Sequence, residues 1–159
     1  MAKMTAVTQI GITTRNLEER IANYEKVGVG PWKIVVDTQK GLGAPASNTK
    51  FRGVPTENDV RVAICVLNGL EMELIQPMDE NGTYADHLRK HGDGYIHHLA
   101  IKTDDNMGFR KIMKAEGCAS EWKGDVDPKL GESFEYFDTR DLLGYIIELH
   151  DPQPVPDED

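Results

Sequence analysis

The segment GLEMELIQP, residues 69–77, has a counterpart 75 residues later in GYIIELHDP, residues 144–152. Both segments read G-x-x-x-E-L-x-x-P, which places Glu73 and Glu148 at the same point of the pattern. Short apolar runs bounded by glycine and proline are typical of β-strands. The pair therefore predicts two related strands, one near the end of each half of the chain.

A second pair of segments occurs in the same order along the chain. QIGITTRN, which begins at Gln9, matches HLAIKTDD, which begins at His98, at an offset of 89 residues. Each segment ends in a residue that favours a helix N-cap, Asn16 or Asp105, and a helical stretch follows. Two matches in the same order indicate an internal duplication.

Each half then predicts a strand, a helix and three further strands, so we expect an α+β fold of two βαβββ modules. The expected order is module one over 5–77, a linker with a short helix over 78–94, module two over 95–151 and a mobile acidic tail over 152–159. Module one is longer by 14 residues, and the excess falls in the glycine-rich segment 38–53. We expect that segment to be a flexible loop able to cover a substrate. Pseudo-twofold symmetry would close the two sheets on each other around a cavity.

Composition excludes several classes of partner. The formal net charge is −9, which disfavours a nucleic-acid partner because such binding needs a basic surface. No apolar run approaches the roughly 20 residues of a membrane helix, and the start MAKMTAV has no apolar signal core. Cys65 and Cys118 form no CxxC motif and are expected to be reduced. We expect a cytoplasmic protein without nucleic-acid or membrane partners.

Four polar residues stand at repeat-related positions: Gln9 with His98, and Glu73 with Glu148. The duplication would bring them together, and oxygen-rich donors with one imidazole suit a divalent ion that keeps open positions. Neighbours on a strand point to opposite faces, so only one of His97 and His98 can join this group. His98 aligns with Gln9, which predicts that His98 is the ligand and that His97 faces the helix layer. The simpler alternative is that Gln9 is an ordinary strand residue and both glutamates are solvated.

These motifs resemble the vicinal oxygen chelate superfamily, also called the glyoxalase/bleomycin-resistance fold, over roughly residues 5–151. The quartet Gln9, Glu73, His98 and Glu148 is similar to the ligand set of eukaryotic-type glyoxalase I. The text MELIQPMDENGTYADHLRKHGDGYIHHLAI is more similar to the methylmalonyl-CoA epimerases, in which histidine usually stands where this chain has Gln9. The resemblance implies one divalent ion (Co, Mn, Zn or Ni) and a homodimer.

A metal ion next to a carbonyl stabilises an enolate, and a nearby carboxylate can remove the α-proton. We therefore expect an epimerase or racemase acting beside a carbonyl or thioester, with Glu73 and Glu148 as catalytic residues. The substrate implied by the resemblance is methylmalonyl-CoA, and relatives also racemise isoflavanones such as dihydrodaidzein. The alternatives are a lactoylglutathione lyase and a metal-free binding or resistance protein.

Other polar residues are weaker candidates. Glu71 shares a strand face with Glu73, and Glu135 follows Phe134 in an apolar strand, so both are candidate substrate-binding residues. His87 and His91 are spaced i, i+4 without a third ligand, and we expect both to lie on the surface.

Overall fold

The computed structural model describes residues 1–126, 129 and 131–152. Its strands are β1 (Met4–Thr13), β2 (Lys33–Asp37), β3 (Ser47–Phe51), β4 (Val54–Pro55), β5 (Val60–Leu67), β6 (Leu70–Pro77), β7 (Ile96–Thr103), β8 (Ser120–Asp125), β9 (Glu132–Phe137) and β10 (Ile146–Pro152). Its helices are α1 (Leu17–Lys26), α2 (Gly82–His91), α3 (Asn106–Ala115) and α4 (Arg140–Leu143). The predicted acidic tail, apart from Pro152, lies outside the described residues.

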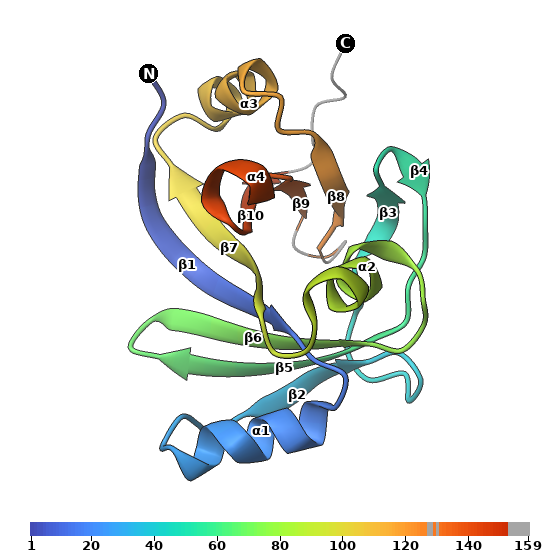
Figure 1. Ribbon diagram of the computed structural model, residues 1–159. Helices are drawn as coiled ribbons and strands as arrows, with labels where there is room; N and C mark the ends of the chain where they lie inside the picture. The colour runs from blue at the N-terminus through green and yellow to red at the C-terminus, as the bar shows by residue number, and fades with distance from the viewer. Residues whose placement is uncertain (127–128, 130, 153–159) are drawn as a thin grey trace.

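All these strands belong to one sheet in the order β2-β5-β6-β1-β7-β10-β9-β8-β3-β4 (Figure 1). The first strands of the two modules, β1 and β7, pair antiparallel at its centre. The fourth strand of each module lies beside its own first strand, because β6 is parallel to β1 and β10 is parallel to β7. The two βαβββ modules are confirmed. The sheet is curved but open, so the expectation of two sheets closing on each other was wrong.

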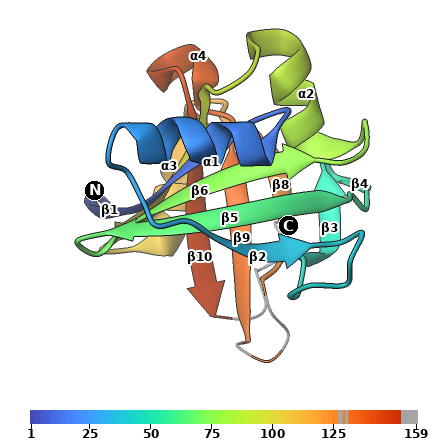
Figure 2. The same cartoon turned by 90° about the horizontal axis from the view of Figure 1, so that it is seen from below.

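Helices α1 and α3 begin at the predicted caps. The Asn16 side chain accepts a hydrogen bond from the Glu19 backbone amide at 3.1 Å, and Asp105 accepts one from Gly108 at 2.9 Å. These caps satisfy amides that the first helical turn leaves unpaired. Each helix then covers the outer face of its own module, α1 over β5 and β6 and α3 over the strands of module two (Figures 1 and 2).

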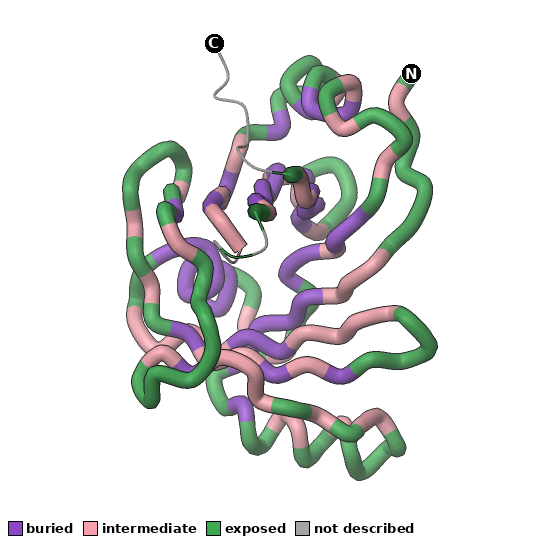
Figure 3. Tube along the Cα trace, turned by 180° about the vertical axis from the view of Figure 1, so that it is seen from behind, coloured by how far each residue is buried: buried purple, intermediate pink, exposed green. Residues whose placement is uncertain are grey.

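A third apolar cluster lies on the inner face, where the two modules face each other. Its largest members are Tyr84, Trp122, Phe134 and Tyr136. Tyr84 comes from α2, the linker helix, which packs against β1, β6 and β8. Figure 3 shows the contrast between this mostly buried helix and the mostly exposed α1. The linker therefore contributes to the core between the modules.

The glycine-rich segment 38–53 is more ordered than a flexible loop. It contains β3 and continues into the short strand β4, and β3 pairs with β8 of module two. The inserted residues of module one thus extend the far edge of module two. Within segment 38–53, only Ala44 to Ala46 line the inner cavity. This short stretch alone has the position that the expected covering loop would need.

Two further features bear on the expected setting of the protein. No helix in the described ranges is long and apolar enough to cross a membrane. Cys65 and Cys118 are free thiols, each buried in the apolar packing of its own module.

Candidate metal centre and active site

The structure brings the predicted quartet together on the inner face of the sheet. Gln9 Oε1 lies 3.0 Å from His98 Nε2, and Gln9 Nε2 donates to Glu73 Oε2 at 3.1 Å. His98 Nε2 lies 3.3 Å from Glu148 Oε2 and 3.9 Å from Glu73 Oε1. The four side chains come from β1, β6, β7 and β10, four adjacent strands of the sheet, so the duplication builds one shared cluster from both modules.

The centre depends on small residues opposite the long ones. Gly11 faces His98 across the β1–β7 pair, and Ala100 faces Gln9. A Cβ atom at Gly11 would lie 2.0 Å from His98 Cε1, far inside van der Waals contact. Tyr136 covers the imidazole, with ring centroids 4.7 Å apart. The absence of a side chain at Gly11 therefore gives the His98 ring its place between the strands.

The two glutamates have different surroundings. Burial raises the pKa of Glu73 to about 7, and the neighbouring carboxylates of Glu148 and Glu71 add to this rise, although His98 opposes it. Burial acts in the same direction on Glu148, but the contacts with His150 and His98 outweigh it and lower its pKa to about 2. His150 Nε2 lies 2.9 Å from Glu148 Oε1. In the repeat register His150 corresponds to Ile75, so only module two has this cation.

A cavity of about 300 Å³ opens over this cluster. Its walls are mainly apolar and come from both modules, and Gln9, Glu71, Glu73, Glu148 and His150 are the polar groups around the centre. The apolar wall is Val35, Val36, Ala44, Pro45, Ala46, Val60, Val62, Ile64, Ile75, Trp122, Val126 and Phe134. Within the described ranges, no lysine or arginine lines the cavity. The cavity thus joins a polar, acidic floor to apolar walls.

His97 points away from this cavity, as the alternation of the strand predicted. It is fully buried, and its Nε2 lies 2.9 Å from Thr83 Oγ1 of α2. Its ring also packs 5.0 Å from the ring of Tyr84, measured between centroids. Burial, together with the nearby His98 and His87, holds the pKa of His97 well below its usual value, so this imidazole is uncharged.

Three weaker expectations had mixed outcomes. Glu71 lies at the centre, because Gln9 Nε2 donates to Glu71 Oε1 at 2.5 Å. Glu135 does not face the cavity: Phe134 and Tyr136 do, and Glu135 on the other face accepts from Arg110 Nε of α3 at 3.0 Å. His87 is only 3% exposed, contrary to expectation, because α2 turns it toward His97.

Sequence reasoning also missed a residue that belongs to the site. His150 lies two residues after Glu148, and a period of two on a strand places both on one face. That signal was present in GYIIELHDP. By contrast, nothing local in the sequence marks Tyr84 or Trp122 as inner residues, because α2 and β8 meet only in the folded chain.

The donor set fits a divalent ion, although the side chains now bond to one another. No group of three or more histidine, cysteine, aspartate or glutamate side chains in the described residues already stands as a metal cage. Glutamine is the extra donor here. Glu148 Oε2 is buried and makes no hydrogen bond within the described residues, and His98 Nε2 lies 3.3 Å from it. A buried carboxylate oxygen without a hydrogen bond is costly unless a cation or donor meets it. One ion bound by Gln9, Glu73, His98 and Glu148 would satisfy it.

The fold and this centre define the class of protein. Residues 8–136 match the glyoxalase/bleomycin resistance protein/dioxygenase superfamily, and the chain belongs to it. Among curated proteins, the mitochondrial methylmalonyl-CoA epimerase of Dictyostelium discoideum is 23% identical over 148 residues, covering 91% of this chain and 77% of that protein.

Solved structures give the same picture of the fold. A variant methylmalonyl-CoA epimerase of Streptomyces coelicolor, in complex with 2-nitronate-propionyl-CoA, superposes with a TM-score of 0.63 at 20% identity, over 98% of this chain and 100% of that one. The methylmalonyl-CoA epimerase from Mycobacterium tuberculosis gives 0.60 at 21% identity, over 95% and 90% of the two chains.

Proposed function

We propose that this protein is a metal-dependent epimerase or racemase that moves a proton on the carbon next to a carbonyl or thioester group. The observation that carries the proposal is the placement of two carboxylates around one imidazole. Glu73 and Glu148 come from β6 and β10, which flank the central β1–β7 pair on opposite sides, and they lie 3.9 and 3.3 Å from His98 Nε2. The similarity to methylmalonyl-CoA epimerases supports the same class of reaction.

Gln9, Glu73, His98 and Glu148 would hold the ion. When bound, a divalent ion would polarise the substrate carbonyl and lower the barrier to loss of the α-proton. Glu73 or Glu148, or both, would take that proton, and a carboxylate on the other side would return it to the opposite face of the carbon. With a substrate bound, the apolar walls of the cavity would exclude water and so strengthen the electrostatic contacts at the reacting carbon.

The cavity favours a substrate whose reacting part is uncharged. The acidic floor contains Glu71, Glu73 and Glu148, and two of these carboxylates would neutralise a divalent ion. With apolar walls around that floor, a neutral cyclic ketone such as an isoflavanone fits the described lining better than an anionic acyl group does. The anionic substrate to compare with such a ketone is methylmalonyl-CoA, for which the similar proteins are named.

A solvent-exchange screen tests the reaction. The protein, loaded with Co²⁺ or Mn²⁺, is incubated in deuterium oxide with methylmalonyl-CoA, with the glutathione hemithioacetal of methylglyoxal, or with dihydrodaidzein, and followed by NMR and chiral chromatography. We expect deuterium at the stereocentre and loss of optical purity with one substrate class, abolished by a chelator. Formation of a thioester from the hemithioacetal would instead identify a lactoylglutathione lyase. No exchange and no bound metal would identify a binding protein.

We also propose that the protein is a homodimer, as its resemblance to the superfamily implies. Sedimentation analysis should give about twice the chain mass of 17.8 kDa. A single species of the monomer mass at micromolar concentration would contradict this proposal.

A further inference from the structure

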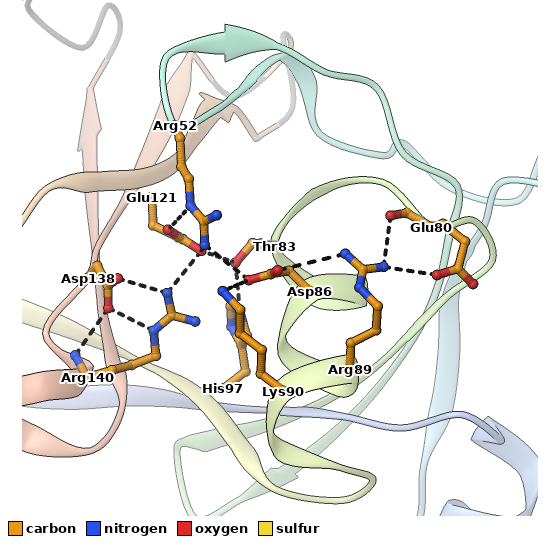
Figure 4. Close-up of polar contacts among 10 residues, drawn as sticks. All are labelled: Arg52, Glu80, Thr83, Asp86, Arg89, Lys90, His97, Glu121, Asp138 and Arg140. Atoms are coloured by element: carbon orange, nitrogen blue, oxygen red, sulfur yellow. Dashed lines mark hydrogen bonds and ion pairs between the residues drawn. The ribbon is translucent and has the colours of Figure 1, made fainter.

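A buried line of polar side chains connects His98 Nδ1, on the side of the ring away from the cavity, through Thr83 of α2 to Glu121 of β8. His98 Nδ1 lies 2.9 Å from His97 Nδ1, and His97 Nε2 lies 2.9 Å from Thr83 Oγ1. Thr83 Oγ1 in turn lies 3.4 Å from Glu121 Oε1 of β8. None of these four residues is more than 2% exposed. Figure 4 shows the part of this line from His97 through Thr83 to Glu121.

The contacts fix the direction of the hydrogen bonds when no ion is bound. Gln9 Oε1, a carbonyl oxygen, lies 3.0 Å from His98 Nε2 and can only accept, so His98 Nε2 carries the hydrogen. His98 Nδ1 must then accept from His97 Nδ1. His97 Nε2, left without a hydrogen, accepts from the hydroxyl of Thr83.

We propose that His97 and Thr83 are positioning residues that set the tautomer of His98, and thereby the metal affinity of the centre. The inference rests on the proposed metal centre. An imidazole that binds an ion through Nε2 must carry its hydrogen on Nδ1. The line then reverses: His98 Nδ1 donates to His97 Nδ1, His97 Nε2 donates to Thr83 Oγ1, and the Thr83 hydroxyl donates to Glu121. Each imidazole keeps one hydrogen in both arrangements, so the number of protons is unchanged.

Two arginines fix the Glu121 carboxylate where it can accept a hydrogen bond from the Thr83 hydroxyl. Arg52 Nε donates to Glu121 Oε2 at 3.0 Å, and Arg140 Nη2 donates to Glu121 Oε1 at 3.2 Å (Figure 4). These two guanidinium groups limit the rotation of the Glu121 carboxylate, which remains able to accept a further hydrogen bond. Arg52 comes from the turn between β3 and β4, so the insertion of module one helps to support the end of the line.

The repeat shows that the line is specific to the histidine side of the centre. In module one the residue that corresponds to His97 is Thr8, whose hydroxyl donates to the Ala100 carbonyl at 3.2 Å. The ligand beside Thr8 is Gln9, and an amide has no tautomer to set. A polar line behind the ligand therefore occurs where an imidazole needs one.

The test compares two threonine variants with a matched control. Thr83→Val removes the hydroxyl at nearly constant shape, and Thr83→Ser keeps it. Thr13→Val makes the same change at a fully buried hydroxyl that has no hydrogen-bond partner among the described residues. Zn²⁺ affinity is measured by calorimetry, and circular dichroism checks folding. We expect Thr83→Val to bind Zn²⁺ about 10–100-fold more weakly, the usual effect of losing such a supporting group. Thr83→Ser and Thr13→Val should stay within about threefold of the wild type.

Nitrogen NMR of histidine-labelled wild type provides a readout independent of activity. Zn²⁺ should move the hydrogen of His98 from Nε2 to Nδ1 and that of His97 from Nδ1 to Nε2. Three results would each overturn the positioning role of His97 and Thr83 while leaving the metal centre intact. They are equal Zn²⁺ affinity in Thr83→Val and the wild type, weak binding by Thr83→Ser, and unchanged tautomers on Zn²⁺ addition. Failure of the wild type itself to bind Zn²⁺ would overturn both the metal centre and the positioning role of His97 and Thr83.

Discussion

At the scale of single residues, the candidate site depends as much on a missing side chain as on those present. Gly11 and His98 face each other across the central pair of strands, and the imidazole occupies the volume that a side chain at position 11 would need. The same register places Ala100 opposite Gln9. Repeat symmetry thus assigns a polar residue and a small residue to each central strand.

Gly11→Ala should therefore damage the centre by displacing His98. Overpacking of this kind typically costs about 1–3 kcal/mol in the free energy of unfolding, and metal binding should weaken with it. In a His98→Ala background the clash is absent, so the same substitution should cost less than about 0.5 kcal/mol. Chemical denaturation of the four proteins of this double-mutant cycle measures the difference. Additive costs would show that the imidazole does not occupy this space.

Glu73 and Glu148 can be separated by replacing each with glutamine, which keeps an oxygen donor but removes a base. Loss of a general base typically slows proton transfer by about 10²–10⁴-fold. If the two carboxylates serve opposite faces, each variant should exchange deuterium into one enantiomer only, with opposite preferences. Chiral analysis of the exchanged substrate reads this out. Racemisation at the wild-type rate by both metal-loaded variants would move the search for the base to Glu71.

At the scale of elements, α3 is attached to the sheet through a buried cation. Arg110 donates from Nε to Glu135 Oε2 at 3.0 Å, and its Nη2 pairs with Asp151 of β10. Arg110 and Glu135 are 4% and 2% exposed. Glu135 therefore stabilises the outer layer of module two and takes no part in the cavity.

Arg110→Met should destabilise the fold by about 3–5 kcal/mol, because it leaves the buried Glu135 and the partly buried Asp151 without their cation. The exposed Lys111→Met on the same helix is the control and should change stability by less than about 0.5 kcal/mol. Thermal unfolding measures both. Exchange activity per folded molecule should stay at the wild-type level in Arg110→Met. A loss of activity in the folded variant would contradict this and indicate that Glu135 takes part in the site.

Most strands and helices were predictable from sequence because they leave local signals, but β3, β4 and α4 were not predicted. Asn16 and Asp105 cap helices, and the repeat placed Gln9 with His98 and Glu73 with Glu148. Glu135 was misplaced because β9 is buried on both faces, so its apolar pattern does not reveal which face meets the cavity. The β3–β8 pairing joins an insertion to a distant strand, and no local pattern records such a partner.

At the scale of the whole molecule, one open sheet separates three apolar clusters. Two lie under α1 and α3 on the outside, and the third lies inside, where the modules meet around the polar centre. The linker helix α2 closes the inner side and brings His87 against His97, with ring centroids 4.9 Å apart. Buried histidines therefore connect the stability of the molecule to pH.

Two histidines should shape opposite limbs of the pH-stability profile of the metal-free protein. Burial, with help from the nearby His91 and Arg140, lowers the pKa of His87 to about 4. Stability from an uncharged His87 is complete above its unfolded pKa near 6.5 and falls as pH drops toward 4. Burial opposes the charge on His150, but Glu148 and Glu132 outweigh it and raise its pKa to about 9. Its contribution is complete below about 6.5 and is lost as pH rises through 9.

His87→Phe should therefore make the acid limb shallower, and His150→Phe should make the alkaline limb shallower. At pH 4.5 the cost of keeping a buried His87 uncharged is roughly 2–3 kcal/mol, so the wild type should lose about that much more than His87→Phe between pH 7 and pH 4.5. Urea unfolding of the three proteins from pH 4.5 to 9.5, with a chelator present, measures both limbs. Each variant is the other's control, since each keeps the histidine that the other lacks. Parallel acid limbs in His87→Phe and the wild type would mean that His87 gains its proton without unfolding cost, and the packing of α2 against β7 would then be looser than the buried contact between His87 and His97 requires.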